Sequence, residues 1–188
     1  TDLIVTGEWM PIKIFKNNKG KFTVTDQSRS TGLWQTVFAA DVNGDGHQDI
    51  LAGNWGWNNK FWAGKNGPLK LYVKDFDLNG SIDQILAYTI DKKEYTFLAK
   101  DELERAIPVL KKAYLNYSEV AGQTVQYMFY DLFKDYKELT AEVLGSSCCM
   151  NDGKGNFKRI DLPKELQLAP VFSFSSFNGN TNNYLAGG

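Results

Sequence analysis

Short apolar or alternating segments, separated by clusters of Asn, Asp and Gly, make up most of this chain. Segments of this length between turn-forming residues are typical of β-strands joined by tight turns. Many short strands favour an all-β sandwich, a barrel or a propeller, and periodicity alone does not separate these folds. The pattern predicts strands at residues 3–5, 12–15, 21–24, 36–40, 50–52, 69–73 and 85–90.

One stretch of the chain has a longer period. Asp101 and Glu104 have the spacing of a capping box at the start of a helix. Pro108 should end or kink this helix, or lie in the first turn of a second one. We therefore predict a helical insertion at about 100–137 within a β framework, with its aromatic residues in the core. Apolar residues fall three or four apart, on one helical face, at Leu103, Ile107, Leu110 and Tyr114.

Two kinds of segment recur along the chain. Residues 15–22 and 150–157 share a turn rich in Asn and Gly that ends in Phe, with a looser echo at 65–67. Each is predicted to be a hairpin turn in which Gly takes a positive φ. Residues 41–53 and 75–87 share an acidic loop followed by an apolar run, and residues 176–188 carry a degraded copy without the acids. The repetition predicts one repeat-built domain over residues 1–188, a fragment of a longer array with roughly three units.

The two acidic loops, at residues 41–49 and 75–83, both obey the pattern D-x-[DN]-x-[DN]-G-x-x-D. Calcium takes about six to eight oxygen ligands, and positions 1, 3 and 5 can converge on one ion when the loop curls. Gly at position 6 allows the turn, position 7 offers its carbonyl, and Asp at position 9 closes the shell. Three carboxylates this close repel one another without a cation. The sequence therefore predicts two Ca²⁺ sites. The predicted ligands are Asp41, Asn43, Asp45, Asp49 and the His47 carbonyl in the first loop, and Asp75, Asp77, Asn79, Asp83 and the Ser81 carbonyl in the second.

Neither loop is an EF-hand, because the Glu required at position 12 is replaced by Ala52 and Leu86. The alternative is that each loop is only a polar turn, and the full spacing in two loops favours metal sites. His47 is the only histidine. At position 7 it should offer its carbonyl to the ion while its imidazole faces solvent, so no catalytic role is predicted for it.

A second candidate site lies in residues 54–62, where three Trp stand among amide side chains. Indole faces can stack on sugars, and amides can bind hydroxyl groups. Trp55, Trp57 and Trp62 are therefore candidate ligand-binding residues. The alternative is that these Trp pack between neighbouring repeats.

Composition and charge narrow the range of functions. The net charge of −1 gives no basic footprint of the kind that nucleic-acid binders carry. No apolar run approaches the roughly 20 residues of a membrane span. The chain lacks a Gly-x-Ser-x-Gly elbow, a phosphate loop and zinc-ligand spacing. Ser146 and Ser147 have no candidate histidine partner, because His47 is the only histidine. We therefore expect a protein that is not an enzyme. Cys148 and Cys149 are adjacent, so on a strand one should point inward and the other outward.

Residues 36–53 resemble the FG-GAP or VCBS repeat of integrin α-subunit propellers and many bacterial surface proteins. With the Gly-Glu-Trp-Met-Pro segment at residues 7–11, the helical stretch and residues 162–170, nearly the whole chain resembles multi-repeat VCBS proteins of Bacteroidetes. The resemblance implies a mainly β fold, a partial β-propeller of about three blades with a small helical insertion, and calcium in the hairpin loops. It also implies an extracellular, cell-surface or periplasmic location and a non-catalytic role in recognition or adhesion.

The chain departs from the repeat pattern in its last copy, where Ser176, Asn180 and Tyr184 stand in place of acids. About three blades cannot close a ring, since propellers have about four to eight. Exposed strand edges would then associate with another copy or with a partner. The expected partner is a protein or a glycan. A carbohydrate-binding or carbohydrate-processing propeller that uses the Trp residues is the alternative function.

Overall fold

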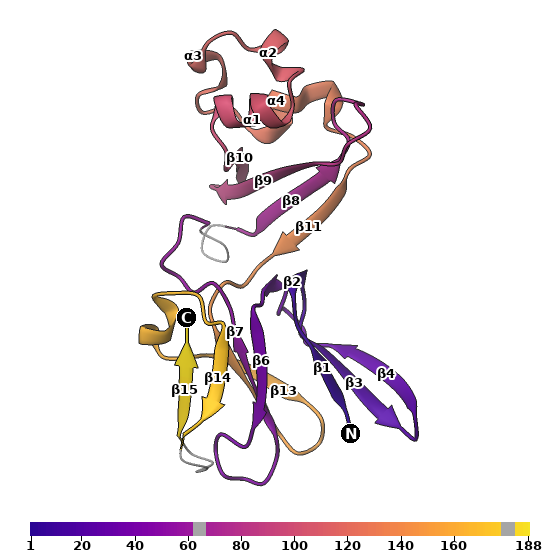
Figure 1. Cartoon of the computed structure of the whole chain (residues 1–188), viewed down its shortest axis with the longest axis vertical. Helices are drawn as coiled ribbons and strands as arrows, with labels where there is room; N and C mark the ends of the chain where they lie inside the picture. The colour runs from indigo at the N-terminus through magenta and orange to yellow at the C-terminus, as the bar shows by residue number, and fades with distance from the viewer. Residues whose placement is uncertain (62–66, 178–182) are drawn as a thin grey trace. The chain divides into compact units, whose positions relative to one another are not determined.

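The computed structural model describes residues 1–61, 67–177 and 183–188, and its secondary structure is mainly β, as predicted (Figure 1). The chain forms two compact units. The first unit contains residues 1–60 and 141–188, and the second contains residues 61–140. The described strands form separate sheets of three, four, four, two and two strands, none of which closes on itself.

The first unit is built from four of these sheets. Their strand orders are β1-β3-β4, β13-β12-β7-β6, β14-β15 and β2-β5. The 3₁₀-helix η2 (Lys164–Gln167) precedes β14. The strands are β1 (Leu3–Val5), β2 (Glu8–Met10), β3 (Lys13–Asn18), β4 (Lys21–Asp26), β5 (Gly32–Leu33), β6 (Thr36–Ala40), β7 (Asp49–Gly53), β12 (Ser147–Asn151), β13 (Phe157–Asp161), β14 (Ser173–Ser176) and β15 (Tyr184–Gly187).

The predicted hairpin turn at residues 15–22 joins β3 to β4. Asn18 pairs with Lys21, which leaves Lys19 and Gly20 as a two-residue turn. Both turn residues have positive φ, of 51° and 90°, as the tightest hairpin turns require. The Gly20 N–H donates to the Asn17 side chain at 2.7 Å, which fixes the turn.

The core of the first unit centres on β7, whose five residues are all buried. Antiparallel partners flank β7 on both sides, β6 on one and β12 on the other. The Trp34 indole N–H donates to the Ser30 carbonyl at 2.7 Å, so its burial leaves no unpaired donor. The main cluster of buried residues is Ile12, Ile14, Trp34, Ile50, Ala52 and Cys149.

Cys148 and Cys149 do not divide into one buried and one exposed residue. Both are free thiols and both are buried, because β12 is covered on its two faces. Burial raises the pKa of Cys148 to about 12 and that of Cys149 to about 11. Thiols of this kind are inert at neutral pH, since the thiolate is the reactive form.

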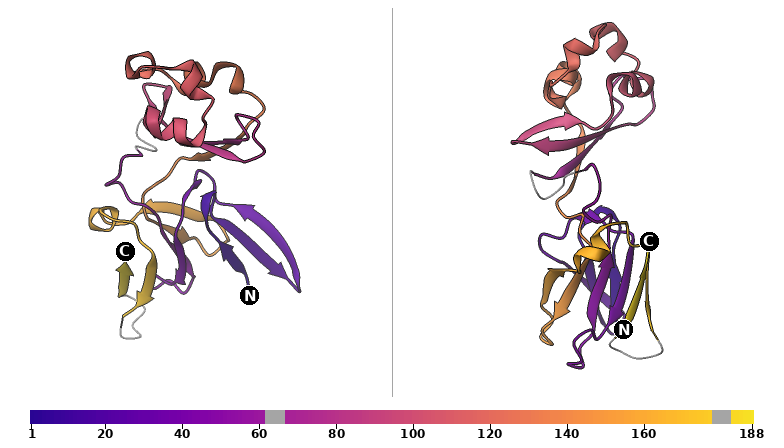
Figure 2. Two further views of the ribbon diagram at one scale, coloured as in Figure 1. Left: turned by 45° about the horizontal axis from the view of Figure 1, so that its top comes forward. Right: turned by 90° about the vertical axis from the view of Figure 1, so that its left-hand side faces the viewer.

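The second unit is a four-stranded sheet, in the order β10-β9-β8-β11, with short helices against it (Figure 2). Its core joins Tyr72, Phe76 and Ile85 of the sheet side to Leu103, Val125 and Phe129 of the helical side. The elements are β8 (Leu69–Lys74), β9 (Asp83–Ile90), β10 (Lys93–Thr96), α1 (Lys100–Ala106), α2 (Leu110–Ala113), α3 (Tyr117–Val120), α4 (Val125–Phe129), the 3₁₀-helix η1 (Tyr130–Leu132) and β11 (Lys137–Ala141).

The start of α1 differs from the predicted capping box. The Ala99 N–H donates to the Glu102 carboxylate at 3.0 Å, so the cap lies at Ala99 rather than Asp101. Glu104 instead pairs with Lys100 at 2.5 Å and is buried. Pro108 lies between the end of α1 and the start of α2, as its missing N–H predicts.

A polar network around Glu94 links β8, β10 and α4. The Glu94 carboxylate accepts hydrogen bonds from the Tyr72 hydroxyl and from Gln126, the latter at 2.6 Å. It also pairs with Lys70 at 2.7 Å. Burial acts to raise the pKa of Glu94, yet the hydrogen bonds from Lys70, Tyr72 and Gln126 together lower it. The ionised carboxylate therefore stabilises the folded second unit.

We expect Glu94→Gln to lower the free energy of unfolding at pH 7 by about 1–2 kcal/mol, because an amide cannot match these charge-assisted bonds. A lowered pKa means that Glu94 adds stability above its unfolded pKa of about 4.3 and loses it as the pH falls through the folded pKa. The variant should therefore lose less stability than the wild type between pH 7 and pH 3.5. Urea unfolding followed by far-UV circular dichroism at both pH values measures this difference.

Glu138→Gln is the matched control. Glu138 pairs with the same Lys70, at 3.1 Å, but its side chain is 37% exposed, against 15% for Glu94. The control should cost less stability and change the pH dependence less. Equal effects of the two substitutions would show that the Glu94 network is not a stabilising feature.

Candidate metal centre

The first acidic loop joins β6 to β7 and wraps its backbone around Asp41. Asp41 Oδ1 accepts hydrogen bonds from the N–H groups of Gly44 at 2.8 Å and Asp45 at 3.1 Å. Asp41 Oδ2 accepts from the Gly46 N–H at 2.8 Å. Gly44 and Gly46 have φ of 77° and 86°, which lets the chain curl in this way.

Asp49 closes the first loop from position 9. It is fully buried, and its Oδ2 accepts from the Val42 N–H at 3.0 Å. Its Oδ1 accepts from the Asn151 N–H at 2.7 Å. Asp45 accepts hydrogen bonds from the Asn43 amide and the His47 N–H, each at 2.8 Å, and these bonds lower the pKa of Asp45.

The second acidic loop joins β8 to β9 and repeats the arrangement of the first. Asp75 accepts from the Asn79 N–H at 3.0 Å and from the Gly80 N–H at 2.8 Å. Asp83 Oδ2 accepts from the Phe76 N–H at 2.9 Å, as Asp49 does from Val42. The Ser81 N–H donates to the Asn79 side chain at 2.7 Å, which matches the bond from His47 to Asp45. The two loops are therefore closely similar in local structure.

The loops differ in how far their carboxylates converge. Asp75, Asp77 and Asp83 each place an oxygen within 4.8 Å of the others, and theirs is the one such group of acids found in the described part of the chain. Burial raises the pKa of Asp83, and the charges of Asp77 and Asp75 raise it further. In the first loop the second acid, Asp45, is at position 5 rather than at position 3. Its carboxylate accepts hydrogen bonds from the Asn43 amide and the His47 N–H. The sequence pattern does not distinguish the two arrangements.

The donor chemistry of both loops fits calcium. Each loop offers three carboxylates, one Asn amide oxygen and a backbone carbonyl, all of which are oxygen donors. Calcium is a hard cation that takes oxygen ligands in a flexible arrangement. The close carboxylates in the second loop are an arrangement that a cation stabilises, because it offsets their mutual repulsion.

The first loop has contacts that the sequence did not predict. The Asn151 side chain donates to the Gln48 carbonyl at 3.0 Å, and the Tyr184 hydroxyl donates to the Asp41 carbonyl at 3.0 Å. A Cβ at Gly153 would lie 2.4 Å from His47 Nε2, so the imidazole of this exposed residue covers the β12–β13 turn. These partners lie more than a hundred residues away in the sequence and carry no local signal of the contact.

The two described Trp residues of segment 54–62 differ in exposure. Trp55 is partly buried, Trp57 is 54% exposed, and Trp62 lies outside the described residues. The backbone N–H of Trp57 donates to the Gln167 carbonyl at 2.7 Å, and that of Gly56 donates to the Leu144 carbonyl at 2.7 Å. The Asn58 amide donates to the Leu168 carbonyl at 3.2 Å. Trp57 is therefore an exposed ring on an anchored loop.

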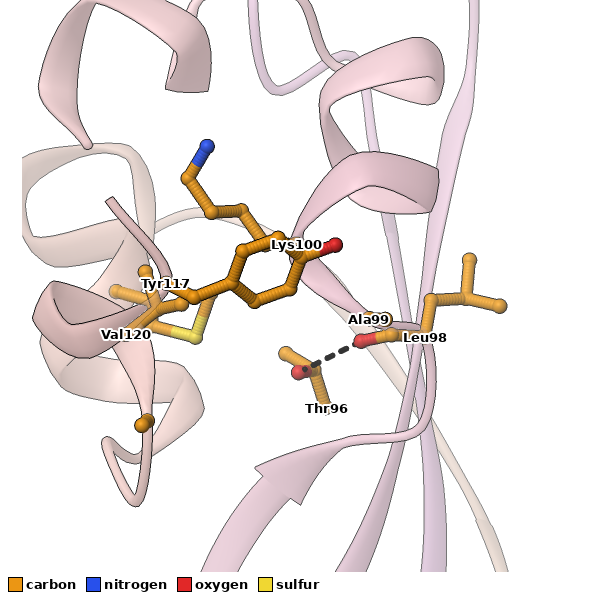
Figure 3. A pocket seen from close by; sticks show the side chains of 8 residues that line it. Thr96, Leu98, Ala99, Lys100, Tyr117 and Val120 are labelled. Atoms are coloured by element: carbon orange, nitrogen blue, oxygen red, sulfur yellow. Dashed lines mark hydrogen bonds between the residues drawn. The ribbon is translucent and has the colours of Figure 1, made fainter. Parts of the chain in front are cut away.

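A pocket of about 220 Å³ lies between β10, α1, α3 and α4 in the second unit (Figure 3). The Thr96 hydroxyl donates to the Leu98 carbonyl at 3.1 Å, and the ammonium of Lys100 pairs with Glu104. Its polar groups thus have partners within the unit, and they do not form a catalytic arrangement. The lining residues are Thr96, Leu98, Ala99, Lys100, Tyr117, Val120, Ala121 and Met128.

Comparison with known proteins identifies one family. Residues 1–52 match the model of the FG-GAP-like repeat, and this match includes the first acidic loop. The chain therefore contains an FG-GAP-like repeat, as the sequence resemblance predicted. No curated protein and no solved structure matches the chain. Among the described helices, none is both long enough and apolar enough to cross a bilayer.

The different carboxylate arrangements predict opposite effects of neutralising one acid in each loop when calcium is removed. In excess chelator, Asp77→Asn should raise the free energy of unfolding by about 0.5 kcal/mol, because it removes a charge that repels Asp75 and Asp83. Asp45→Asn should lower it, because Asp45 lies outside such a group and loses its charge-assisted bonds. Urea unfolding of both variants measures the signs. The same sign in both loops would contradict the difference described here.

Proposed function

We propose that this chain, whose residues 1–52 match the FG-GAP-like repeat, is a calcium-binding, non-catalytic recognition or adhesion module of a secreted or cell-surface protein. In this proposal, calcium structures the two acidic loops. The partner is a protein or a glycan. The convergence of Asp75, Asp77 and Asp83 within 4.8 Å is the observation that carries the proposal.

The residues that would hold calcium are those at positions 1, 3, 5, 7 and 9 of each loop, with position 7 offering its carbonyl. Asp41 and Asp75 already organise the backbone of their loops through accepted N–H bonds. Asp49 and Asp83 stand at the start of β7 and β9. An ion held by positions 1 and 9 would fasten the ends of β6 and β7, and of β8 and β9, to each other. Extracellular modules use such sites at affinities of about 10⁻⁴–10⁻³ M.

The repeats are proposed to be blades of a partial β-propeller, about three in number. The four-stranded antiparallel sheet β13-β12-β7-β6 supports this, because propeller blades are four-stranded sheets. A non-catalytic role is supported by the serines that the sequence singled out. Ser146 and Ser147 are fully buried, and Ser146 Oγ accepts from the Asn54 N–H at 3.0 Å.

Calcium should stabilise the chain against heat. A ligand that binds only the folded state adds about 2.7 kcal/mol at a hundredfold excess over its dissociation constant. We expect a rise in the unfolding temperature in millimolar calcium, relative to excess chelator, that is reduced in both Asp45→Ala and Asp77→Ala. Differential scanning calorimetry measures it.

Asp26→Ala is the control for this experiment. Asp26 pairs with Lys13 at 2.8 Å in the β3–β4 hairpin, outside both loops, so its calcium response should equal that of the wild type. An unfolding temperature that calcium leaves unchanged in the wild type would mean that the loops are ordinary polar turns.

Carbohydrate binding is the second candidate function, and the exposed indole of Trp57 favours it. Ring faces of this kind stack on sugars, and the amides of Asn58 and Asn59 adjoin the ring in sequence. The hydrogen bonds that anchor residues 56–58 would hold the ring in place before a ligand arrives.

Glycan-array binding tests this second function. We expect the wild type to bind a class of glycans and Trp57→Ala to lose that binding by at least about tenfold, which corresponds to one stacking contact of roughly 1.4 kcal/mol. The variant should keep its calcium response, because the exposed ring contributes little to the core. A wild type that binds no glycan would remove carbohydrate recognition from consideration.

A further inference from the structure

The strand β4 forms one free edge of the sheet β1-β3-β4 (Figure 1). It is the longest edge strand of the described sheets, and all six of its residues are exposed. Its charged residues are Lys21 and Asp26 at its two ends, and the four residues between them are Phe, Thr, Val and Thr. The edge strand β13, by contrast, carries Lys158 and Arg159 within it. Charges within an edge strand discourage further strand pairing, and β4 lacks them.

The register of the β3–β4 hairpin shows which groups of β4 face β3. Asn18 and Lys21 flank the two-residue turn, so they form a hydrogen-bonded pair. Hydrogen-bonded and non-hydrogen-bonded pairs alternate along an antiparallel ladder, so the odd-numbered residues of β4 bond to β3. Beyond the strand, the Gln27 N–H donates to the Ile12 carbonyl at 2.8 Å, as this alternation requires.

The even-numbered residues of β4 face the free edge. Phe22, Val24 and Asp26 therefore direct their backbone N–H and C=O groups away from β3, and no described strand pairs with β4 on that side. The Asn17 N–H, opposite Phe22, agrees with this pattern. It donates to the Asp2 side chain at 2.9 Å rather than to β4.

This free edge is complementary to itself in an antiparallel arrangement. A two-fold axis between two Thr23 residues places Phe22 of each copy opposite Val24 of the other, and the outward groups of both residues can then bond. Phe22 is 54% exposed and Val24 is 53% exposed, and pairs of an aromatic with a β-branched side chain stabilise antiparallel strands. The Lys21 end of each strand meets the Asp26 end of the other, so the charges match as well. A register shifted by two residues would place Phe22 against Asp26 instead.

We propose that two copies of this chain associate through β4 and form a continuous six-stranded sheet, with three strands from each copy. The sequence predicts association through exposed edges but does not name the edge. The interface consists of backbone hydrogen bonds and a few side chains, so the association is weak and depends on protein concentration. It does not involve the acidic loops, and it is therefore the same in calcium and in chelator.

Disulfide crosslinking of the full chain tests both the partner and the register. In the proposed dimer the two Thr23 residues form a non-hydrogen-bonded pair with Cα atoms about 4.5 Å apart, which a disulfide can span. We expect Thr23→Cys to form a covalent dimer in oxidised glutathione, seen by non-reducing electrophoresis. Thr25→Cys is the matched control, because residue 25 is exposed on the same face of β4. Its two copies would lie four residues apart along the strand, about 14 Å, and should not link. Cys148 and Cys149 are buried, so the wild type should not link either.

Sedimentation velocity in both calcium and chelator, from about 1 µM to about 1 mM protein, measures the association without a crosslink. We expect a monomer–dimer equilibrium that Val24→Pro weakens by about tenfold or more. Proline removes an outward donor from each copy, while the β3–β4 ladder does not use that N–H. Val24→Thr is the matched control, because it keeps the N–H and the branched shape and should weaken the dimer less. Far-UV circular dichroism checks that the variants are folded.

Three results would each overturn the proposal. The first is a wild type that stays monomeric over the whole concentration range. The second is a dimer that Val24→Pro leaves unchanged, which would place the contact elsewhere on the chain. The third is equal crosslinking of Thr23→Cys and Thr25→Cys, which would indicate random collision rather than one register.

Discussion

Each acidic loop is closed by a buried carboxylate that accepts the N–H of the residue at position 2. Asp49 binds the Val42 N–H at 3.0 Å, and Asp83 binds the Phe76 N–H at 2.9 Å. A buried carboxylate is stable only when its oxygens have partners, so these bonds determine how the loop leaves one strand and enters the next. The other oxygen of Asp49 takes the Asn151 N–H, which joins the loop to β12. The β13-β12-β7-β6 sheet and the loop at its end are therefore one hydrogen-bonded assembly.

The second unit uses the same loop in a different setting. Phe76, at position 2, packs on Phe129 of α4, so the loop is held by an aromatic core rather than by a neighbouring hairpin. The polar network of Glu94 links α4 to β8 and β10. Leu78 and Ile82 of the loop are exposed. The two loops thus share a backbone arrangement but present different surfaces to a partner.

The sequence predicted local features better than long-range ones. The strands at Leu3–Val5 and Thr36–Ala40 were predicted with the bounds that the structure has, because alternation and turn residues act within a few positions. The short strands β2 and β5 pair with each other across more than twenty residues and were not predicted. Both cysteines are buried because β12 is covered on two faces, and no local pattern shows that. The cap of α1 lay two residues before the predicted one, since Glu102 rather than Glu104 reaches back to the N-terminal N–H.

Sequence reasoning named the candidate ligands of both loops residue by residue, but it did not predict the difference between the loops. Both loops satisfy one pattern, yet among the described residues only the second loop, with Asp at position 3 and Asn at position 5, brings three carboxylates within 4.8 Å of one another. A direct count of bound ions tests the central claim, namely that both loops hold calcium. Isothermal titration calorimetry should give two calcium ions per chain for the wild type, one for Asp41→Ala, one for Asp75→Ala and none for the double variant. An unchanged count in either single variant, or no binding of calcium at millimolar concentration, would contradict it.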